Sequence, residues 1–255
     1  MPSRNRPAAI PALAPAETAA GDETRMATLR VGAALPDPPF EFVPPEGPAG
    51  FDIELMQHIA AKLGRAWQLA NYAGADFNGV TGAYDCVAFG TTITPAREKI
   101  ADFCAPYAVS WQSVVVDATR HPQVHSINDL AGLVIGVQHG NTSEPMAERI
   151  VADHRAARVR VYAYHEIEKA LGDLSTGGCD AFMKLAPVTA WLVRDRPRLK
   201  VVQVGITTER LGICVRKGDT ALRAAIDKAQ AELAADGTLA ALVKAWLGAG
   251  AHLPG

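Results

Sequence analysis

A basic residue stands where a helix is expected to begin, directly after a strand that ends in polar residues. The segment DCVAFGTTITPAREK (85–99) predicts a strand, a threonine-rich turn, and a helix with Thr94 as N-cap and Pro95 at its first position. Arg97 then lies in the first helical turn, where a cation opposes the helix dipole. An anionic ligand shared by the helix N-terminus, the threonine hydroxyls and the guanidinium would explain this placement. The alternative is a surface arginine whose charge is offset by Glu98.

A second junction of the same kind follows later in the chain. VIGVQHGNTSEP (134–145) predicts a buried strand, a glycine-containing turn and a helix start. Asn141, Thr142 and Ser143 are all residue types that cap helices, and capping alone explains only one of them. One such junction in each half of the chain favours two lobes that converge on one small anion.

The elements that must position these residues alternate between strand and helix. Such alternation predicts an α/β fold with open, mostly parallel sheets, and the number of strands suits two small sheets better than one. Ligands of such sheets bind beyond the carboxyl ends of the strands. The predicted strands are 29–35, 66–72, 84–90, 113–117, 133–138, 159–163, 180–184, 199–204 and 211–216, and the predicted helices lie near 51–63, 94–99, 144–154, 167–174, 187–193 and 222–246.

Composition argues against several classes of function. The 255 residues include 25 basic and 27 acidic side chains without a run of like charge, which disfavours a nucleic-acid surface or a polybasic membrane patch. No apolar stretch approaches the roughly 18–20 residues of a membrane-spanning helix. Four cysteines without CxxC spacing and seven scattered histidines predict no metal site and no cofactor. An exported protein could still form one or two disulfides, and the sequence does not say which.

The first 26 residues are expected to be a disordered leader. Arg4 and Arg6 precede an alanine-rich stretch, as in a secretory signal, but three prolines interrupt the apolar region. The sequence alone therefore does not demonstrate export.

Six segments, in order along the chain, carry a resemblance to a known family: PPFEF (38–42), GFDIELMQHIAAKLG (50–64), GTTITPAREKIADFCAPY (90–107), VIGVQHGNTSE (134–144), GGCDAFMKLAPVTAWLV (177–193) and LGICVRKGDTALRAAIDKAQAELAADGTLAALVKAWLG (211–248). They resemble the family 3 extracellular solute-binding proteins, the polar-amino-acid receptors of ABC importers. The resemblance implies a two-lobed, type II periplasmic-binding-protein-like fold with two crossovers. Lobe 1 would hold 27–116 and 208–250, and lobe 2 would hold 117–207.

The resemblance also implies a function and a set of binding residues. A periplasmic, monomeric, non-enzymatic receptor would carry a small-molecule solute to a membrane permease. The ligand carboxylate would be held by Arg97, Thr92 and the Gly90 backbone of lobe 1 and by Thr142 of lobe 2, where Asn141 is a further candidate. Phe77 would pack against the ligand.

Three positions depart from the family pattern. Many relatives carry an aspartate for the ligand's α-ammonium where this chain has Leu185, preceded by Lys184. The usual aromatic lid before PPF is Asp37 here. The stretch from Phe77 to Asp85 is about five residues shorter than usual, so the helix normally there is expected to be stunted or missing.

These departures leave two ligand hypotheses open. Either Asp37 reads the amino group from the opposite lobe, or the ligand has no α-ammonium and Lys184 meets a second acidic group. Lys184 as a solvated strand end and Asp37 as an ordinary loop residue remain the simpler alternatives.

Two functions other than that of a receptor are compatible with the fold that the resemblance implies. Some relatives of this fold are cyclohexadienyl dehydratases, which need a carboxylic acid in the cleft as general acid. Leu185 occupies that position, so catalysis is not favoured. A partner protein of a periplasmic enzyme that has lost ordinary ligand binding would also fit the altered ammonium position and the shortened loop.

Overall fold

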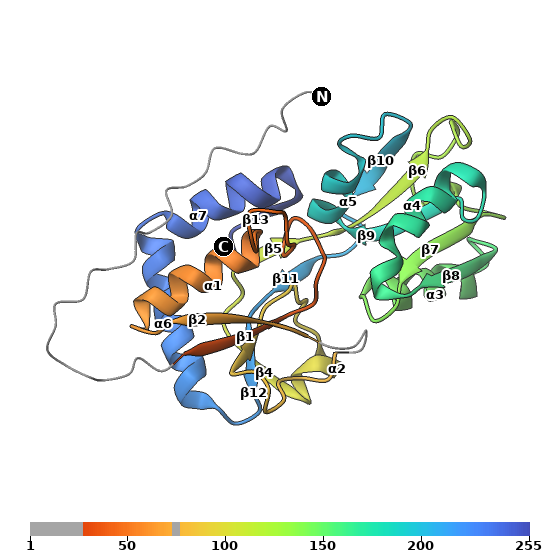
Figure 1. Ribbon diagram of the computed structural model, residues 1–255. Helices are drawn as coiled ribbons and strands as arrows, with labels where there is room; N and C mark the ends of the chain where they lie inside the picture. The colour runs from red at the N-terminus through yellow and green to blue at the C-terminus, as the bar shows by residue number, and fades with distance from the viewer. Residues whose placement is uncertain (1–27, 73–76) are drawn as a thin grey trace, which may run out of the picture.

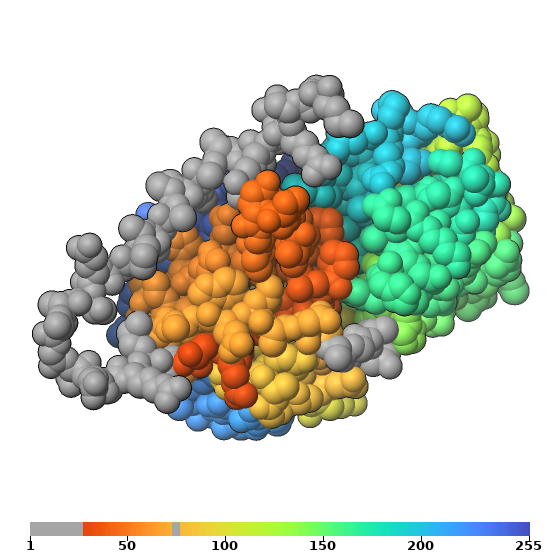
Figure 2. Space-filling view, viewed as in Figure 1, coloured from red at the N-terminus to blue at the C-terminus, as the bar shows by residue number. Residues whose placement is uncertain are grey.

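The computed structural model describes residues 28–72 and 77–255, which form two lobes, each built on its own five-stranded sheet (Figure 1). The predicted α/β class is confirmed, since helices cover both sheets. The predicted leader, 1–26, lies outside the described residues. Figure 2 shows the first lobe, in orange and yellow, beside the second lobe, in green and cyan. No helix within 28–72 or 77–255 has the length and apolar character needed to cross a membrane.

The sheet of the first lobe has the strand order β2-β1-β3-β12-β4. Its strands are β1 (Leu29–Ala33), β2 (Trp67–Asn71), β3 (Cys86–Val87), β4 (Ala101–Phe103) and β12 (Cys214–Arg216). β1 runs parallel to β2 and β3, whereas β12 is antiparallel to its neighbours. The carboxyl ends of β1 and β3 therefore share one edge, and the polar junction that follows β3 lies there.

Helices α1 (Phe51–Lys62) and α6 (Thr220–Ala235) pack on this sheet and on each other, and α7 (Thr238–Leu242) packs on both helices. Phe51, Leu55 and Ile59 recur every four residues along α1 and are fully buried, which is the stripe that a core-facing helix requires. Gly50 fixes the start of α1. A Cβ at this residue, whose φ is 127°, would stand 2.3 Å from the Phe40 carbonyl oxygen.

The sheet of the second lobe has the order β10-β6-β9-β7-β8. Its strands are β6 (Gln112–Asp117), β7 (Val134–Gln138), β8 (Arg158–Tyr162), β9 (Ala181–Leu185) and β10 (Leu199–Val204), and its helices are α3 (Ser143–Ala152), α4 (Ile167–Thr176) and α5 (Ala186–Val193). Val114, Ile135 and Met183 from three neighbouring strands lie in one buried cluster. The carboxyl end of β7 leads directly into the second polar junction.

A small third sheet lies where the chain passes between the lobes. β5 (Ala108–Ser110) is flanked by β11 (Glu209–Leu211) and by β13 (Ala251–His252). Immediately after it, β6 pairs with β9 and β10 of the second sheet. The sheets therefore change at Trp111, which corrects the boundary expected between 116 and 117. The run SVVVD is apolar on both faces, so its composition could not show which sheet it joins.

The shortened stretch of the first lobe contains no helix between Phe77 and Asp85, as its length predicted. It is tied down by Tyr72, whose hydroxyl donates to the Gly79 carbonyl at 3.0 Å and accepts from the Asn78 N–H at 2.8 Å. A single aromatic side chain thus anchors the loop in place of helical packing.

Candidate functional site

The two predicted strand-to-helix junctions face each other across the gap between the lobes. Arg97, in the short helix α2 (Pro95–Glu98), donates to the Thr92 carbonyl oxygen at 2.9 Å and to the Gly140 carbonyl oxygen at 3.1 Å. Thr92 belongs to the first junction and Gly140 to the second. The predicted meeting of the two junctions at Arg97 is therefore confirmed, and the alternative of a surface arginine is wrong.

Arg97 is held from behind by its own lobe. Thr94 caps α2 as predicted, since its hydroxyl accepts from the Arg97 N–H at 3.2 Å. The guanidinium lies 5.2 Å from the centre of the Phe77 ring, which stacks on Phe103. Burial lowers the pKa of Arg97. Phe77 thus lies behind the guanidinium and does not line the cavity, and its direct packing against a ligand stays a prediction.

A cavity of about 20 Å³ lies between the junctions. This volume holds about one water molecule, so a solute of several heavy atoms requires the lobes to separate. Of the eight residues predicted to bind ligand, seven line the cavity and Phe77 does not. The lining residues are Asp37, Phe89, Gly90, Thr91, Thr92, Arg97, Gln112, Asn141, Thr142, Ser143, Lys184 and Leu185.

Several lining residues carry buried polar atoms without a hydrogen-bond partner in the described part of the chain. These atoms are Thr91 Oγ1 and Asp37 Oδ1 from the first lobe, and Gln112 Oε1 and Ser143 Oγ from the second. Buried polar groups are almost always paired, by protein or by something bound. Four unpaired oxygens around one cavity between the lobes therefore point to a polar occupant.

Two predicted clamp groups are already engaged. The Gly90 N–H donates to Asp52 Oδ2 at 2.5 Å, so only the carbonyl of Gly90 is left for a ligand. Thr142 makes no side-chain cap on α3. Its hydroxyl accepts from Gln112 Nε2 at 2.9 Å and donates to Glu209 Oε2 at 3.3 Å. Binding of a ligand by Gly90 and Thr142 stays a prediction, and it would have to use the groups that these bonds leave available.

Asp37 and Lys184 form an ion pair from opposite lobes. Lys184 Nζ lies 3.1 Å from Asp37 Oδ2, and the side chains are 3% and 7% exposed. The ammonium also donates to Gln138 Oε1 and lies 5.6 Å from the centre of the Tyr164 ring. The simpler alternatives, a solvated lysine and an ordinary loop aspartate, are therefore wrong.

Two more buried carboxyl groups lie behind Asp37 in the first lobe. Glu41 is fully buried and neither carboxyl oxygen has a partner among the described residues. Burial, together with the charges of Asp37 and Asp52, raises the pKa of Glu41 well above its ordinary value. Burial also raises the pKa of Asp52 to about 7. In both groups the neutral form is favoured by burial and by the charge of the neighbouring acids.

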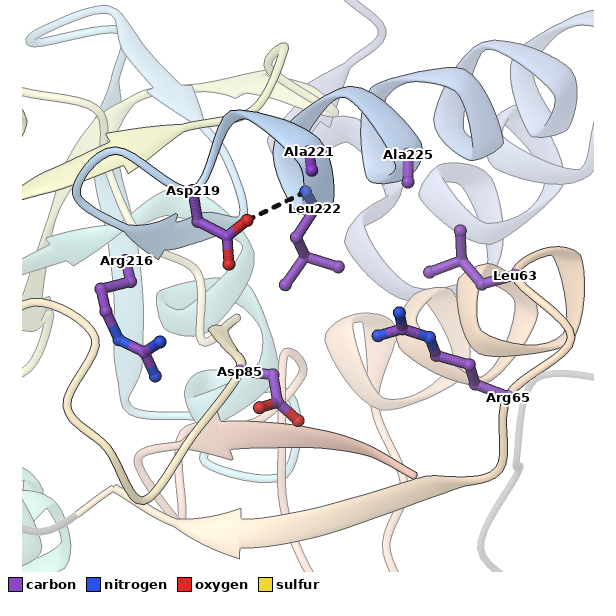
Figure 3. A pocket seen from close by; sticks show the side chains of 8 residues that line it. All are labelled: Leu63, Arg65, Asp85, Arg216, Asp219, Ala221, Leu222 and Ala225. Carbon is purple, nitrogen blue, oxygen red and sulfur yellow. Dashed lines mark hydrogen bonds between the residues drawn. The ribbon is translucent and has the colours of Figure 1, made fainter. Parts of the chain in front are cut away.

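No other place in the described residues offers a comparable site. They contain no cluster of three or more metal-ligating side chains, and all four cysteines are buried and free. A cavity of about 450 Å³ lies at the opposite edge of the first sheet (Figure 3), where Asp219 caps α6 by accepting from the Leu222 N–H. Its other carboxylate, Asp85, is paired with Arg30 at 2.7 Å. Both acids there are already committed within the protein.

Comparison with known proteins decides the family. Residues 29–249 match the bacterial extracellular solute-binding proteins, family 3. The chain is 30% identical over 230 residues to the L-cystine-binding protein TcyJ of Escherichia coli (strain K12), which covers 87% of this chain and 83% of that protein. The chain belongs to this family.

Solved structures of similar proteins support the family 3 assignment and its fold. An ancestral arginine-binding protein bound to arginine is 35% identical, with a TM-score of 0.77 and coverage of 87% of this chain and 99% of that one. The ancestral amino acid-binding protein AncCDT-1, a precursor of cyclohexadienyl dehydratase, is 30% identical, with a TM-score of 0.75 and coverage of 87% and 96%. The predicted type II fold and the receptor class of this family 3 protein are confirmed.

Several polar residues of this family 3 site were not predicted from the sequence. Gln112 and Gln138 are both buried amides that border an apolar run, Gln112 at the start of β6 and Gln138 at the end of β7. That pattern was a usable signal, because such amides must find partners inside the protein. Glu209 had no comparable signal, since its partner Thr142 lies far away in the chain.

Proposed function

We propose that this chain holds a small carboxylate-bearing solute between its lobes and presents it to the permease of an ABC importer. The observation that carries the proposal is Arg97, which reaches from one lobe to a carbonyl oxygen of the other. A guanidinium matches the two oxygens of a carboxylate better than it matches two neutral carbonyls. A ligand carboxylate would therefore replace Thr92 O and Gly140 O as its partners.

The unpaired oxygens of the cavity supply the rest of the site. Hydroxyl groups of Thr91 and Ser143 can donate to a bound anion from opposite lobes. A solute that contacts both lobes stabilises the closed form relative to the open form, which is what a receptor of this kind must do. The same contacts with only one lobe would bind ligand without favouring closure.

We propose binding without catalysis. The acid nearest to the cavity, Asp37, is engaged by Lys184, and the neighbouring Leu185 offers no proton. A general acid needs a titratable group within hydrogen-bond reach of the substrate. Each lobe of the site comes from the same chain, so we expect a monomer. The extracellular character of the family supports action in the periplasm.

A second candidate is a partner protein without a small ligand. The cavity of about 20 Å³ and an internal ion pair inside it favour this alternative. It predicts that no carboxylate binds the purified protein, whereas the receptor proposal predicts that at least one does.

The test is an Arg97→Ala variant, with Arg210→Ala as a control at an exposed position. A thermal-shift screen of carboxylates on the refolded protein would first identify a ligand. Arg97→Ala should weaken its binding by ~2–5 kcal/mol, the usual cost of removing one partner of a buried charge pair. Arg97→Lys, which keeps the charge but loses the fork, should weaken binding less. Equal affinity in Arg97→Ala and the native protein would overturn the proposed clamp.

A further inference from the structure

The cavity contains a cation that belongs to the protein itself. Lys184 Nζ lies 3.1 Å from Asp37 Oδ2, and Asp37 is the sole carboxylate among the residues that line the cavity. The pair joins the two lobes at the same cavity that Arg97 lines. A ligand ammonium that used Asp37 would have to share it with Lys184 or displace it.

The ammonium is fixed in this position from several sides. Gln138 accepts from Lys184 Nζ, and Gln138 is itself held because its Nε2 donates to the Tyr164 carbonyl at 2.5 Å. The Asn141 amide donates to the same Gln138 oxygen at 3.2 Å. Lys184 is therefore positioned before any ligand arrives, and moving it would break a network with four members.

The charges of the lining residues favour an anion over a zwitterion. The wall carries two cations, Arg97 and Lys184, and one carboxylate, Asp37. A ligand with one negative charge brings the lining to neutrality. An amino acid adds no net charge and places a second ammonium beside Lys184, where like charges in a closed cleft repel.

The neighbouring acids do not alter this balance. Glu41 lies behind Asp37, off the cavity wall, and burial raises its pKa well above the ordinary value. Glu209 also lies off the wall, and its two oxygens accept from Thr142 at 3.3 Å and Thr207 at 2.7 Å. Neither acid lies on the cavity wall, where a ligand ammonium would be bound.

We infer that the site selects carboxylic acids that carry an oxygen where an amino acid carries its α-ammonium, with Lys184 as the specificity-determining residue. This inference rests on the proposed function, in which Arg97 holds the carboxylate. Two N–H groups of Lys184 are used by Asp37 and Gln138, and the third has no partner among the described residues. It donates to the α-oxygen of a 2-oxo or 2-hydroxy acid.

The test uses refolded, ligand-free full-length protein and isothermal titration calorimetry with matched compounds that share one carbon skeleton. The sets are pyruvate, lactate and alanine; 3-methyl-2-oxobutanoate, 2-hydroxy-3-methylbutanoate and valine; and 4-methyl-2-oxopentanoate and leucine. The oxo or hydroxy compound is expected to bind at least 100-fold more tightly than the amino acid in the skeleton that fits best. Tighter binding of the amino acid in that skeleton overturns the inference.

A Lys184→Met variant sharpens the test, with the exposed Lys200→Met as control. Removal of the ammonium leaves Asp37 to receive one from the ligand, so the preference should move at least tenfold toward the amino acid. Lys200→Met should leave the preference unchanged. An unchanged preference in a folded Lys184→Met protein overturns the role of Lys184. If that variant does not fold, the ratio measured on the native protein decides alone.

Failure of the inference can be told from failure of the proposed function. An amino acid that binds the native protein more tightly, and loses its affinity in Arg97→Ala, leaves the clamp standing and refutes the selection against ammonium. Oxo-acid binding that survives Arg97→Ala refutes the clamp. Absence of binding throughout the three sets refutes both and favours the partner-protein alternative.

Discussion

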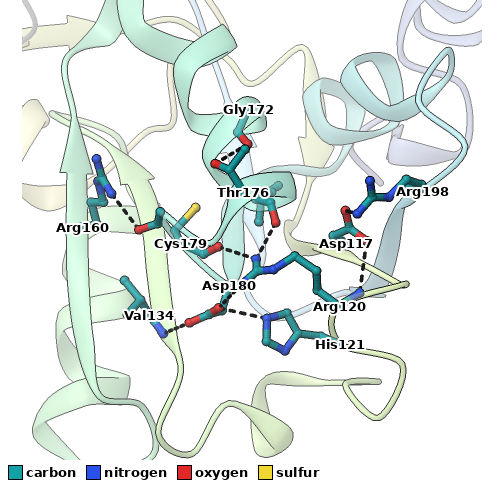
Figure 4. Close-up of polar contacts among 12 residues, drawn as sticks. Asp117, Arg120, His121, Val134, Arg160, Gly172, Thr176, Cys179, Asp180 and Arg198 are labelled. Atoms are coloured by element: carbon teal, nitrogen blue, oxygen red, sulfur yellow. Dashed lines mark hydrogen bonds and ion pairs between the residues drawn. The ribbon is translucent and has the colours of Figure 1, made fainter.

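A charged group lies near each end of strand β9, and the surroundings of the two groups differ. Asp180 precedes the strand at the edge far from the gap, where Val134 N–H, Arg120 and His121 all donate to it at 2.9 Å (Figure 4). Lys184 lies near the other end, faces the opposite lobe, and sits beside carboxyl groups with unpaired oxygens. The charge at one end is paired within its own lobe, and the charge at the other end is paired with Asp37 across the gap.

The pKa of Asp180 and the pKa of Asp52, a buried acid behind Asp37, shift in opposite directions. Partial burial alone would raise the pKa of Asp180, but its three donors hold it below the ordinary value. Burial raises the pKa of Asp52 to about 7, and the Gly90 N–H offsets only part of this. Asp180 is only partly buried and has three fixed donors, whereas Asp52 is fully buried, so depth and donors together separate a structural carboxylate from one kept costly at a binding site.

The largest expected effect comes from breaking the interlobe pair. Lys184→Met leaves Asp37 buried and uncompensated, so the free energy of unfolding should fall by about 3–5 kcal/mol. The double variant Asp37→Asn/Lys184→Met should recover most of the loss, because no unpaired charge remains. Urea unfolding of the ligand-free protein measures both. A loss no greater than that of Lys200→Met would show that the pair contributes nothing, and the comparison would fail.

The next effect concerns pH and the acids behind the pair. Asp52 has its pKa raised from 3.8 to about 7, so its contribution to stability is fully present below about pH 4 and is lost as pH rises through about 7. Stability should fall over this window by up to about 1.4 kcal/mol per pH unit for this one group. Asp180, with a lowered pKa, acts in the reverse sense and loses its contribution as pH falls below about 4.

Asp52→Asn tests this sign, because the asparagine oxygen can still accept from Gly90 N–H. Chemical unfolding between pH 4 and pH 8 should show a shallower decline in the variant than in the native protein. Parallel curves for the two proteins would mean that Asp52 titrates normally, in contradiction to its burial.

The parts of the site that could be predicted from the sequence are those set by local patterns, and the parts that could not depend on contacts between the lobes. Local patterns predicted that Arg97 lies between two junctions. One pattern is the threonine-proline start of a helix, and the other is a polar turn after an apolar strand. Each pattern lies within about fifteen residues of sequence. The pairing of Asp37 with Lys184 is not local. Asp37 lies in a proline-rich loop whose composition predicts exposure to solvent, and only the approach of the second lobe buries it. The change of sheet at Trp111 could not be predicted for a related reason, because an apolar run does not reveal which sheet it joins.

A smaller effect is expected at the other end of β9. Asp180→Ala removes an acceptor shared by Arg120, His121 and the Val134 N–H, and the free energy of unfolding should fall by about 2 kcal/mol. Arg120 would keep its bonds to the carbonyls of Leu174 and Cys179, which limits the loss. Urea unfolding measures this loss, with the exposed Asp195→Ala as control.

Ligand affinity is the discriminating readout for that variant. Asp180 lies at the edge away from the cavity, so the Kd for any ligand that Arg97 holds should stay within a factor of two. A large loss of affinity in a stably folded Asp180→Ala protein would show that the two ends of β9 are coupled, and the division between a structural end and a binding end would fail.

The smallest effect is expected in the cavity of about 450 Å³ at the far edge of the first sheet, which is larger than the one between the lobes (Figure 3). Arg65 lines it, but both acids there are engaged within the protein, Asp85 by Arg30 and Asp219 by the start of α6. Arg65→Ala should therefore change stability by no more than about 0.5 kcal/mol and leave ligand affinity unaltered. Calorimetry beside Arg97→Ala checks this, and a comparable loss in both variants would mean that cavity size, and not unpaired polar atoms between the lobes, marks the binding site.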